Sequence, residues 1–287
     1  MPSETASRRT GHVPVRRCSD FRTLGSTMLF LFLLAGLTAG FFAGMFGIGG
    51  GAIVIPILVH VYRDAGMDMT EAIRLAFGTS LATMAFTGLS SYLSHRQRGN
   101  VDGAWLRKLM LPSGLGALVG GIIAARIPGG WLALGLALML GYFGIKLLVQ
   151  RSDAVVTWPW LERYRHVAGF LSGLTYSLAG MGGASVITFY LTKAGLSLRA
   201  AIGTATGVIL PISVGAILGF GLTAGSPHDW RWGYIDLRAL LALSVCSIVA
   251  SKLGVKTAAW LPVAVLRKGF GFFMFVLAGK TLLGTLS

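Results

Sequence analysis

The stretch GIGGGAIVIP at residues 47–56 decides the fold, because it interrupts a long apolar run with four glycines. The stretch GMGGASVIT at residues 180–188 echoes it. We call residues 47–51 and 180–184 the first and second glycine segments. Each glycine lowers helix stability by about 1 kcal/mol, and a bilayer tolerates broken backbone only where protein or a water-filled cavity covers it. Paired breaks therefore predict a binding site between two parts of the chain.

The glycine segments belong to an internal repeat. Gly36, Gly40, Gly47, Gly49 and Gly50 recur as Gly169, Gly173, Gly180, Gly182 and Gly183; Arg74, Gly78 and Thr79 recur as Arg199, Gly203 and Thr204; Asp102, Gly120 and Pro128 recur as Asp236, Gly254 and Pro262. We therefore divide the chain into a basic cytoplasmic tail (1–27), a first transmembrane repeat (28–149), a polar linker (150–165) and a second transmembrane repeat (166–285).

The composition is that of a membrane protein. Of 287 residues, 54% are hydrophobic and 12% charged, against about 25% charged in an average soluble domain. The net charge of +15 lies in short breaks between apolar runs, which is typical of membrane loops and not of a nucleic-acid surface. No ATP-binding loop, metal spacing or catalytic triad is present in the sequence, so we expect no enzyme activity, cofactor or metal.

The apolar runs predict an all-α polytopic membrane protein with about eight spans in two homologous halves and glycine-rich broken or re-entrant helices. The run 28–62 is too long for one crossing and too short for two, so it fits a full span plus a broken or re-entrant half-span. Its glycines at 36, 40 and 44 predict a close helix contact. The positive-inside bias favours four net crossings per half, which would make the repeats parallel; an odd number would make them inverted.

The glycine segments and the start of the next block supply the candidate substrate-binding residues. They are Gly47, Gly49, Gly50, Gly51, Thr79, Ser80, Gly180, Gly182, Gly183 and Thr204. A helix beginning after a glycine segment turns free N–H groups and its positive dipole end toward the gap, which suits an anion. The alternatives are close packing for the glycines and bonding back to their own helix for the hydroxyls.

Two further sets of side chains have simpler alternatives. Pro56, Arg74 and Arg199 are assigned to gating and to steering of anions, with snorkelling to lipid headgroups as the alternative for the arginines. Asp102 and Asp236 directly precede helical runs and are predicted to be N-caps. No acidic residue lies well inside an apolar run, which disfavours cations as substrates.

At GFFAGMFGIGGG (40–51), Pro56, Gly78-Thr79-Ser80 and the repeat from Gly173 to Gly183 with Thr204, the sequence resembles the sulfite exporter TauE/SafE family. The second segment departs from the first at Ala184 and Phe189. The resemblance implies a multi-pass permease of the bacterial inner membrane, associated with export of sulfite and small organosulfonates. We expect a secondary transporter whose partners are a small anionic substrate and the lipid bilayer, with no nucleic acid; a homodimer is left open. The alternatives are a passive anion channel and a membrane scaffold subunit.

Overall fold

The computed structural model describes residues 26–46, 50–149, 159–181, 183–223 and 230–257, with short stretches between 268 and 281. In the first repeat the helices are α1 (Ser26–Phe46), α2 (Gly51–Asp64), α3 (Met69–Gln97), α4 (Gly103–Arg126) and α5 (Gly129–Val149). The predicted tail lies outside the described residues except for its last two positions, as do residues 150–158 of the predicted linker.

The second repeat follows the same order. After the 3-10 helix η2 (Pro159–Tyr164) come α6 (Arg165–Ala179), α7 (Gly183–Lys193), α8 (Leu198–Thr223) and α9 (Leu237–Thr257), which correspond to α1 to α4. The all-helical prediction missed a short antiparallel hairpin before α9, formed by β1 (Arg231–Trp232) and β2 (Ile235–Asp236). Strands of two residues carry no alternating hydrophobic pattern from which they could be predicted.

The predicted N-caps are confirmed in both repeats. The Asp102 carboxylate accepts hydrogen bonds from the N–H groups of Ala104 and Trp105 at 2.9 and 3.0 Å. The Asp236 carboxylate accepts from Arg238 N at 2.9 Å and from Ala239 N at 3.2 Å. These aspartates therefore fix where α4 and α9 begin.

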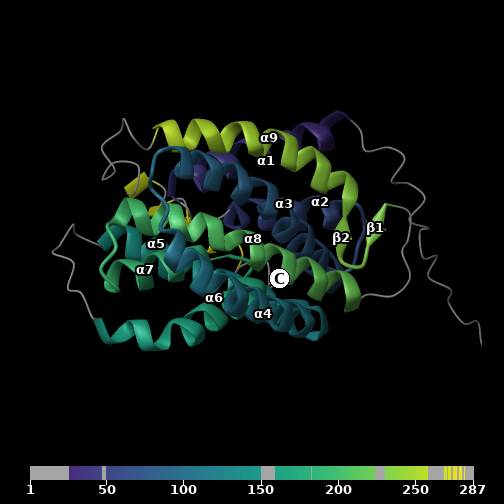
Figure 1. Ribbon diagram of the computed structural model, residues 1–287. Helices are drawn as coiled ribbons and strands as arrows, with labels where there is room; N and C mark the ends of the chain where they lie inside the picture. Colours follow the sequence, from purple (N-terminus) through teal and green to yellow (C-terminus); the bar gives the residue numbers. More distant parts are fainter. Residues whose placement is uncertain are drawn as a thin grey trace, which may run out of the picture.

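Helices of the two repeats are interleaved in three layers (Figure 1). The central helices α3 and α8 lie between a layer formed by α1 and α9 and a layer formed by α4 and α6. The predicted glycine contact is confirmed: a Cβ on Gly40 would lie 2.5 Å from the carbonyl oxygen of Ser247 on α9. Its repeat partner Gly173 is pressed in the same way against Ser113 of α4. The first helix of each repeat thus packs on the fourth helix of the other.

The prediction of parallel repeats is wrong, because the corresponding helices α3 and α8 run in opposite directions. Gly203, near the start of α8, lies against Asn100, just beyond the end of α3. Gly78, near the start of α3, lies against Tyr234, beyond the end of α8. The repeats are therefore inverted. We use the name hairpin side for the side of the bundle where α3 begins. The opposite side, where α3 ends, is called the linker side.

The cause of the error is the short helix α2. Its first residue, Gly51, lies beside Met84 halfway along α3, and its last turn is joined by a short loop to the start of α3. It therefore returns to the hairpin side, from which α1 starts. A full span followed by a shorter helix that turns back is the arrangement expected for residues 28–62. Because α2 brings the chain back to the side from which α1 starts, each half makes an odd number of net crossings.

Five helices in the described part of the chain are long and apolar enough to cross a membrane: α3, α4, the first 18 residues of α5, α8 and α9. A shorter apolar stretch, Leu29–Met45, lies within α1. The molecule is thus a polytopic helical membrane protein, and the count of about eight spans stays a prediction.

Candidate functional site

The two glycine segments come together inside the molecule. Gly51 opens α2, and a Cβ at this position would overlap the carbonyl oxygen of Gly180 and the methyl group of Met84. Gly180 ends α6 with φ of +68°, a left-handed conformation that favours glycine. Gly50, Gly51 and Gly180 are all buried. Of the predicted set, Gly47, Gly49 and Gly182 lie outside the described residues.

Two helix N-termini adjoin this junction. The carbonyl of Gly50 accepts the first bonds of α2, from Ile53 N and Val54 N at 3.1 Å each. The N–H groups of the residues before them have no acceptor within the helix. Helix α7 begins at Gly183, three residues after Gly180. Because both helices point their positive ends at the same buried place, the junction favours a negative charge.

One stripe of α3 forms a wall of the junction. Phe77 and Met84 are seven residues apart and therefore share a face of the helix. Phe77 lies against Gly180, and Met84 contacts both Gly51 and the hydroxyl of Tyr176. Ser80 stands between them on this stripe and is 0% exposed. Ser80 therefore lies on the same stripe of α3 as the side chains that contact Gly51 and Gly180, and its role in binding substrate stays a prediction.

Thr79 and Thr204 hold the two repeats together. The Thr79 hydroxyl accepts a hydrogen bond from Asp236 N at 2.9 Å, and the Thr204 hydroxyl accepts one from Asp102 N at 2.9 Å. Each threonine thus binds the N-cap residue of the other repeat. Tyr62 adds a bond from its hydroxyl to the Asp236 carboxylate at 3.2 Å. Contact of either threonine with a substrate stays a prediction.

Of the residues predicted to gate or to steer, the two arginines lie on opposite sides of the bundle and Pro56 lies beside the junction. Arg74 is on the hairpin side, where its guanidinium donates to the carbonyl of Ile127 at 2.8 and 3.2 Å and to the hydroxyl of Tyr234 at 3.3 Å. It therefore secures the end of α4. Arg199 is exposed near the start of α8, on the linker side. Pro56 lies inside α2, one residue after Ile55, whose side chain touches Gly180. Steering and gating by these residues stay predictions.

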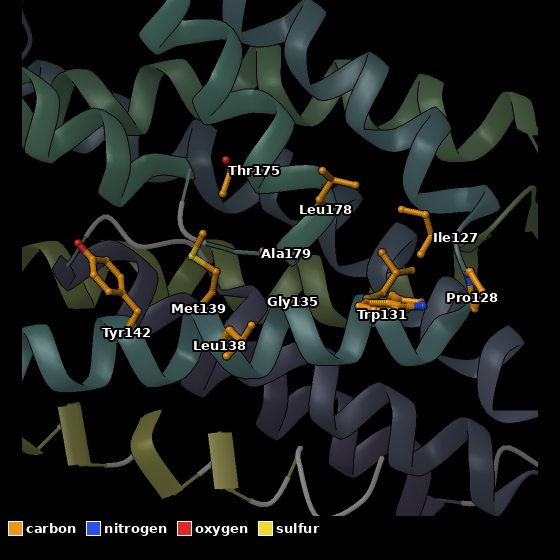
Figure 2. A pocket seen from close by; sticks show the side chains of 11 residues that line it. Ile127, Pro128, Trp131, Gly135, Leu138, Met139, Tyr142, Thr175, Leu178 and Ala179 are labelled. Carbon is orange, nitrogen blue, oxygen red and sulfur yellow. The ribbon is translucent and has the colours of Figure 1, made fainter. Parts of the chain in front are cut away.

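A groove of about 900 Å³ lies between α5 and α6 (Figure 2). Its lining is mostly hydrocarbon, including Leu138, Met139 and Leu178, and Trp131 and Tyr142 stand along α5. Trp131 is 68% exposed, which fits a side chain at the edge of the bilayer. This groove therefore faces lipid and offers an oxyanion few donors.

The junction has no charged wall among the residues that the structure describes. Among the described Asp, Glu, Lys, Arg and His side chains, only those of Asp236 and His95 are buried, and Asp236 lies at the hairpin. Within the same residues, no three His, Cys, Asp or Glu side chains come close enough to hold a metal ion. The polar groups that the described residues offer at the junction are thus N–H and hydroxyl donors.

Sequence reasoning missed Tyr176 and Met84. Both are apolar or aromatic residues within apolar runs, and such residues usually belong to the core. A signal was present in the repeat, because Tyr176 corresponds to Ala43 and Met84 to Ile209. Departures from the symmetry of a repeat mark places where the two halves do different things.

Apolar helices, inverted repeats and broken helices that meet in the interior define a polytopic membrane protein with the architecture of secondary transporters. The family model described as "Sulfite exporter TauE/SafE" matches residues 32–281. The chain belongs to this family, which is a transporter family and not an enzyme family.

Relatives in bacteria and archaea agree. A "Probable membrane transporter protein" of Haemophilus influenzae is 32% identical over 88% of this chain and 97% of its own length. "Probable membrane transporter protein YdhB" of Bacillus subtilis is 29% identical over 88% and 99%. A similarly named protein of Methanocaldococcus jannaschii is 26% identical over 80% and 86%. No solved structure gives a significant match.

Proposed function

We propose that this chain is a secondary transporter that exports small sulfur-containing oxyanions, such as sulfite or organosulfonates, across the bacterial inner membrane. The observation that carries the proposal is the contact between Gly51, which begins α2, and Gly180, which ends α6 three residues before α7 begins. Broken helices that aim their N-termini at an anionic group are a known way for transporters to bind substrate within the membrane. The sulfur chemistry comes from the family name.

The proposed binding step uses neutral donors. An oxyanion at the junction accepts hydrogen bonds from free N–H groups at the starts of α2 and α7, and the helix dipoles offset its charge. Charge-assisted hydrogen bonds of this kind are about twice as strong as neutral ones. Because the junction is closed over by Phe77 and Met84, release requires a movement of the helices around it.

That movement involves bundles that mix the repeats. Helix α1 packs along α9, and α6 packs along α4, so one repeat cannot rock as a unit against the other. The pairs that stay together are α1 with α9 and α6 with α4, and the central helices α3 and α8 lie between them. Their boundary is the contact of α3 with α8, beside which both glycine segments lie. We propose that separation along this boundary opens the site to either side in turn.

The test is counterflow in liposomes that contain the purified full-length chain. We expect labelled sulfite or methanesulfonate to accumulate transiently against an excess of unlabelled anion inside, with saturable kinetics. Gly51→Ala, in protein that elutes and unfolds as a folded species, should reduce uptake at least about tenfold, because the new methyl group overlaps Gly180. Gly130→Ala is the control, since a Cβ there meets no atom within 4 Å.

The alternatives give different results. Flux without counterflow accumulation would indicate a passive channel. No flux of any sulfur anion through folded wild-type protein would favour a scaffold subunit and contradict the proposal. Thermal stabilisation across sulfite, sulfate, thiosulfate, sulfoacetate and small carboxylates would then identify any ligand, since an anion at 100 times its Kd adds about 2.7 kcal/mol to stability.

A further inference from the structure

The two glycine segments match in backbone, but the side chains around them do not. Ser80 corresponds to Ala205 in the repeat, Ser185 to Ala52, and Thr188 to Ile55. Each hydroxyl thus has an apolar counterpart, so the two-fold axis that relates the repeats does not generate a second copy of any of these donors. A ligand held by these hydroxyls would bind off that axis.

The hydroxyl of Ser80 is buried and has no structural role in the described part of the protein. It is 0% exposed, and its Oγ has no hydrogen-bond partner among the residues described. Its place on the α3 stripe between Phe77 and Met84 aims it at the junction of the glycine segments. A buried donor left without a partner is costly, and a ligand that accepts from it removes the cost.

Helix α7 carries two more such groups beside its N-terminus. Ser185 and Thr188 are three residues apart and share a face of the helix. The Oγ atoms of both are buried and have no partner within the described residues. The counterpart of Thr188 in the first repeat, Ile55, lies against Gly180, so this position of the helix faces the junction in the first repeat.

We propose that the transported oxyanion is held at the junction by the hydroxyl of Ser80 on α3, by those of Ser185 and Thr188 on α7, and by the free N–H groups at the start of α7. This inference rests on the proposed function and deepens it. The donors are neutral and come from two helices, α3 and α7. They fit a small anion whose oxygens surround one central atom, as in sulfite or a sulfonate. Thr79 and Thr204, by contrast, join the repeats.

The experiment measures stability and binding separately for Ser80→Ala. In detergent without anion, we expect the variant to unfold at the same temperature as the wild type or higher, because the lost hydroxyl has no partner to miss. Its Kd for sulfite or methanesulfonate, from isothermal titration, should rise at least about tenfold, because a hydrogen bond to a charged ligand is lost. Thr188→Val should weaken binding in the same direction.

Ser113→Ala is the matched control. Ser113 is also a buried serine in a membrane helix, but its hydroxyl bonds back to Leu109 O at 2.6 Å. We expect its Kd to equal that of the wild type.

Three results would overturn the inference. If Ser80→Ala binds as the wild type does while Gly51→Ala does not, the one-sided site is wrong and the proposed function stands. If Ser80→Ala loses stability but keeps its affinity, the hydroxyl is structural. If folded wild-type protein binds neither anion, both the inference and the proposed function fail.

Discussion

Replacing Gly40 by alanine tests the packing on which the interleaved architecture rests. A Cβ at this position would lie 2.5 Å from the carbonyl oxygen and 2.6 Å from the Cα of Ser247. Carbon atoms in ordinary contact are about 3.5–4.0 Å apart. Helices α1 and α9 would therefore have to separate by about 1 Å. The backbone of Ser247 has little freedom to yield, because its hydroxyl is bonded to that of Thr87 at 2.8 Å.

The magnitude follows from two opposing effects. Overpacking of this kind costs about 1–3 kcal/mol, and exchanging glycine for alanine inside a helix returns up to about 1 kcal/mol. We expect Gly40→Ala to lower the free energy of unfolding by about 1–2 kcal/mol. Gly141→Ala gives the opposite sign, because Gly141 lies inside α5 and a Cβ there meets no atom within 4 Å. It should raise the free energy of unfolding by up to about 1 kcal/mol.

Equilibrium unfolding in mixed micelles titrated with SDS, followed by circular dichroism, measures both variants. The comparison within one protein removes the effects of detergent and of helix propensity. A Gly40→Ala protein that is as stable as the wild type, or is stabilised like Gly141→Ala, would refute the close approach of α1 to α9.

Other changes test the remaining contacts. Thr79→Val should lower the free energy of unfolding by about 1–3 kcal/mol, because it leaves a buried amide of the other repeat without its acceptor. Thr204→Val should lower it by less, because the amide that it leaves is only partly buried. Equal effects in the same SDS titration would contradict this. Arg74→Gln should expose the end of α4 to faster hydrogen exchange at its last amides, since the guanidinium holds two carbonyls there; unchanged exchange would argue against the contact. Finally, single cysteines at Ala65, Arg163 and Leu198, in a variant without native cysteines, should react with an impermeant reagent in sealed membranes, Ala65 from one side and Arg163 and Leu198 from the other; labelling of Ala65 and Leu198 from the same side would contradict the inverted repeats.

The orientation in the membrane is a separate question that the same labelling answers. Most basic side chains in α1 to α9 and their described loops lie toward the linker side: Arg96, Arg98, Arg107, Lys108, Lys146, Arg163, Arg165, Lys193, Arg199, Lys252 and Lys256. From these side chains alone, the positive-inside rule predicts that the linker side is cytoplasmic. The basic tail 1–27 argues for the other orientation, since α1 starts from the hairpin side. We expect Arg163→Cys to be labelled from the cytoplasm.

Local features of the fold could be predicted from the sequence. Asp102 and Asp236 are caps because a carboxylate before a helix bonds free N–H groups of the first turn wherever the helix lies. The glycines at 36, 40 and 44 form a contact because their spacing alone places them on one face. The break after residue 46 follows from glycine's poor helix propensity.

Direction and partnership could not be predicted in the same way. The hydrophobicity of α2 is the same whether it continues across the bilayer or turns back, so the positive-inside bias alone favours the wrong number of net crossings per half. The sequence of α1 does not indicate that α9 is its packing partner, because a row of small residues can pack closely against any helix with a flat face. Only its contact with Met84 of α3 places Tyr176 at the junction, and the sequence of α6 carries no sign of that contact.

The interleaving explains why symmetry in the backbone coexists with asymmetry in the site. Thr79 and Thr204 make equivalent bonds to opposite repeats, so a change in one bond alone would unbalance the bundles that must move together. The ligand is under no such constraint, because one anion at the junction can be held by donors from a single side. On the proposed mechanism, selection for alternating movement acts on both repeats alike, whereas selection for substrate acts on Ser80 without acting on its counterpart, Ala205. For this reason we look for specificity where the repeats differ, and for the mechanism of movement where they agree.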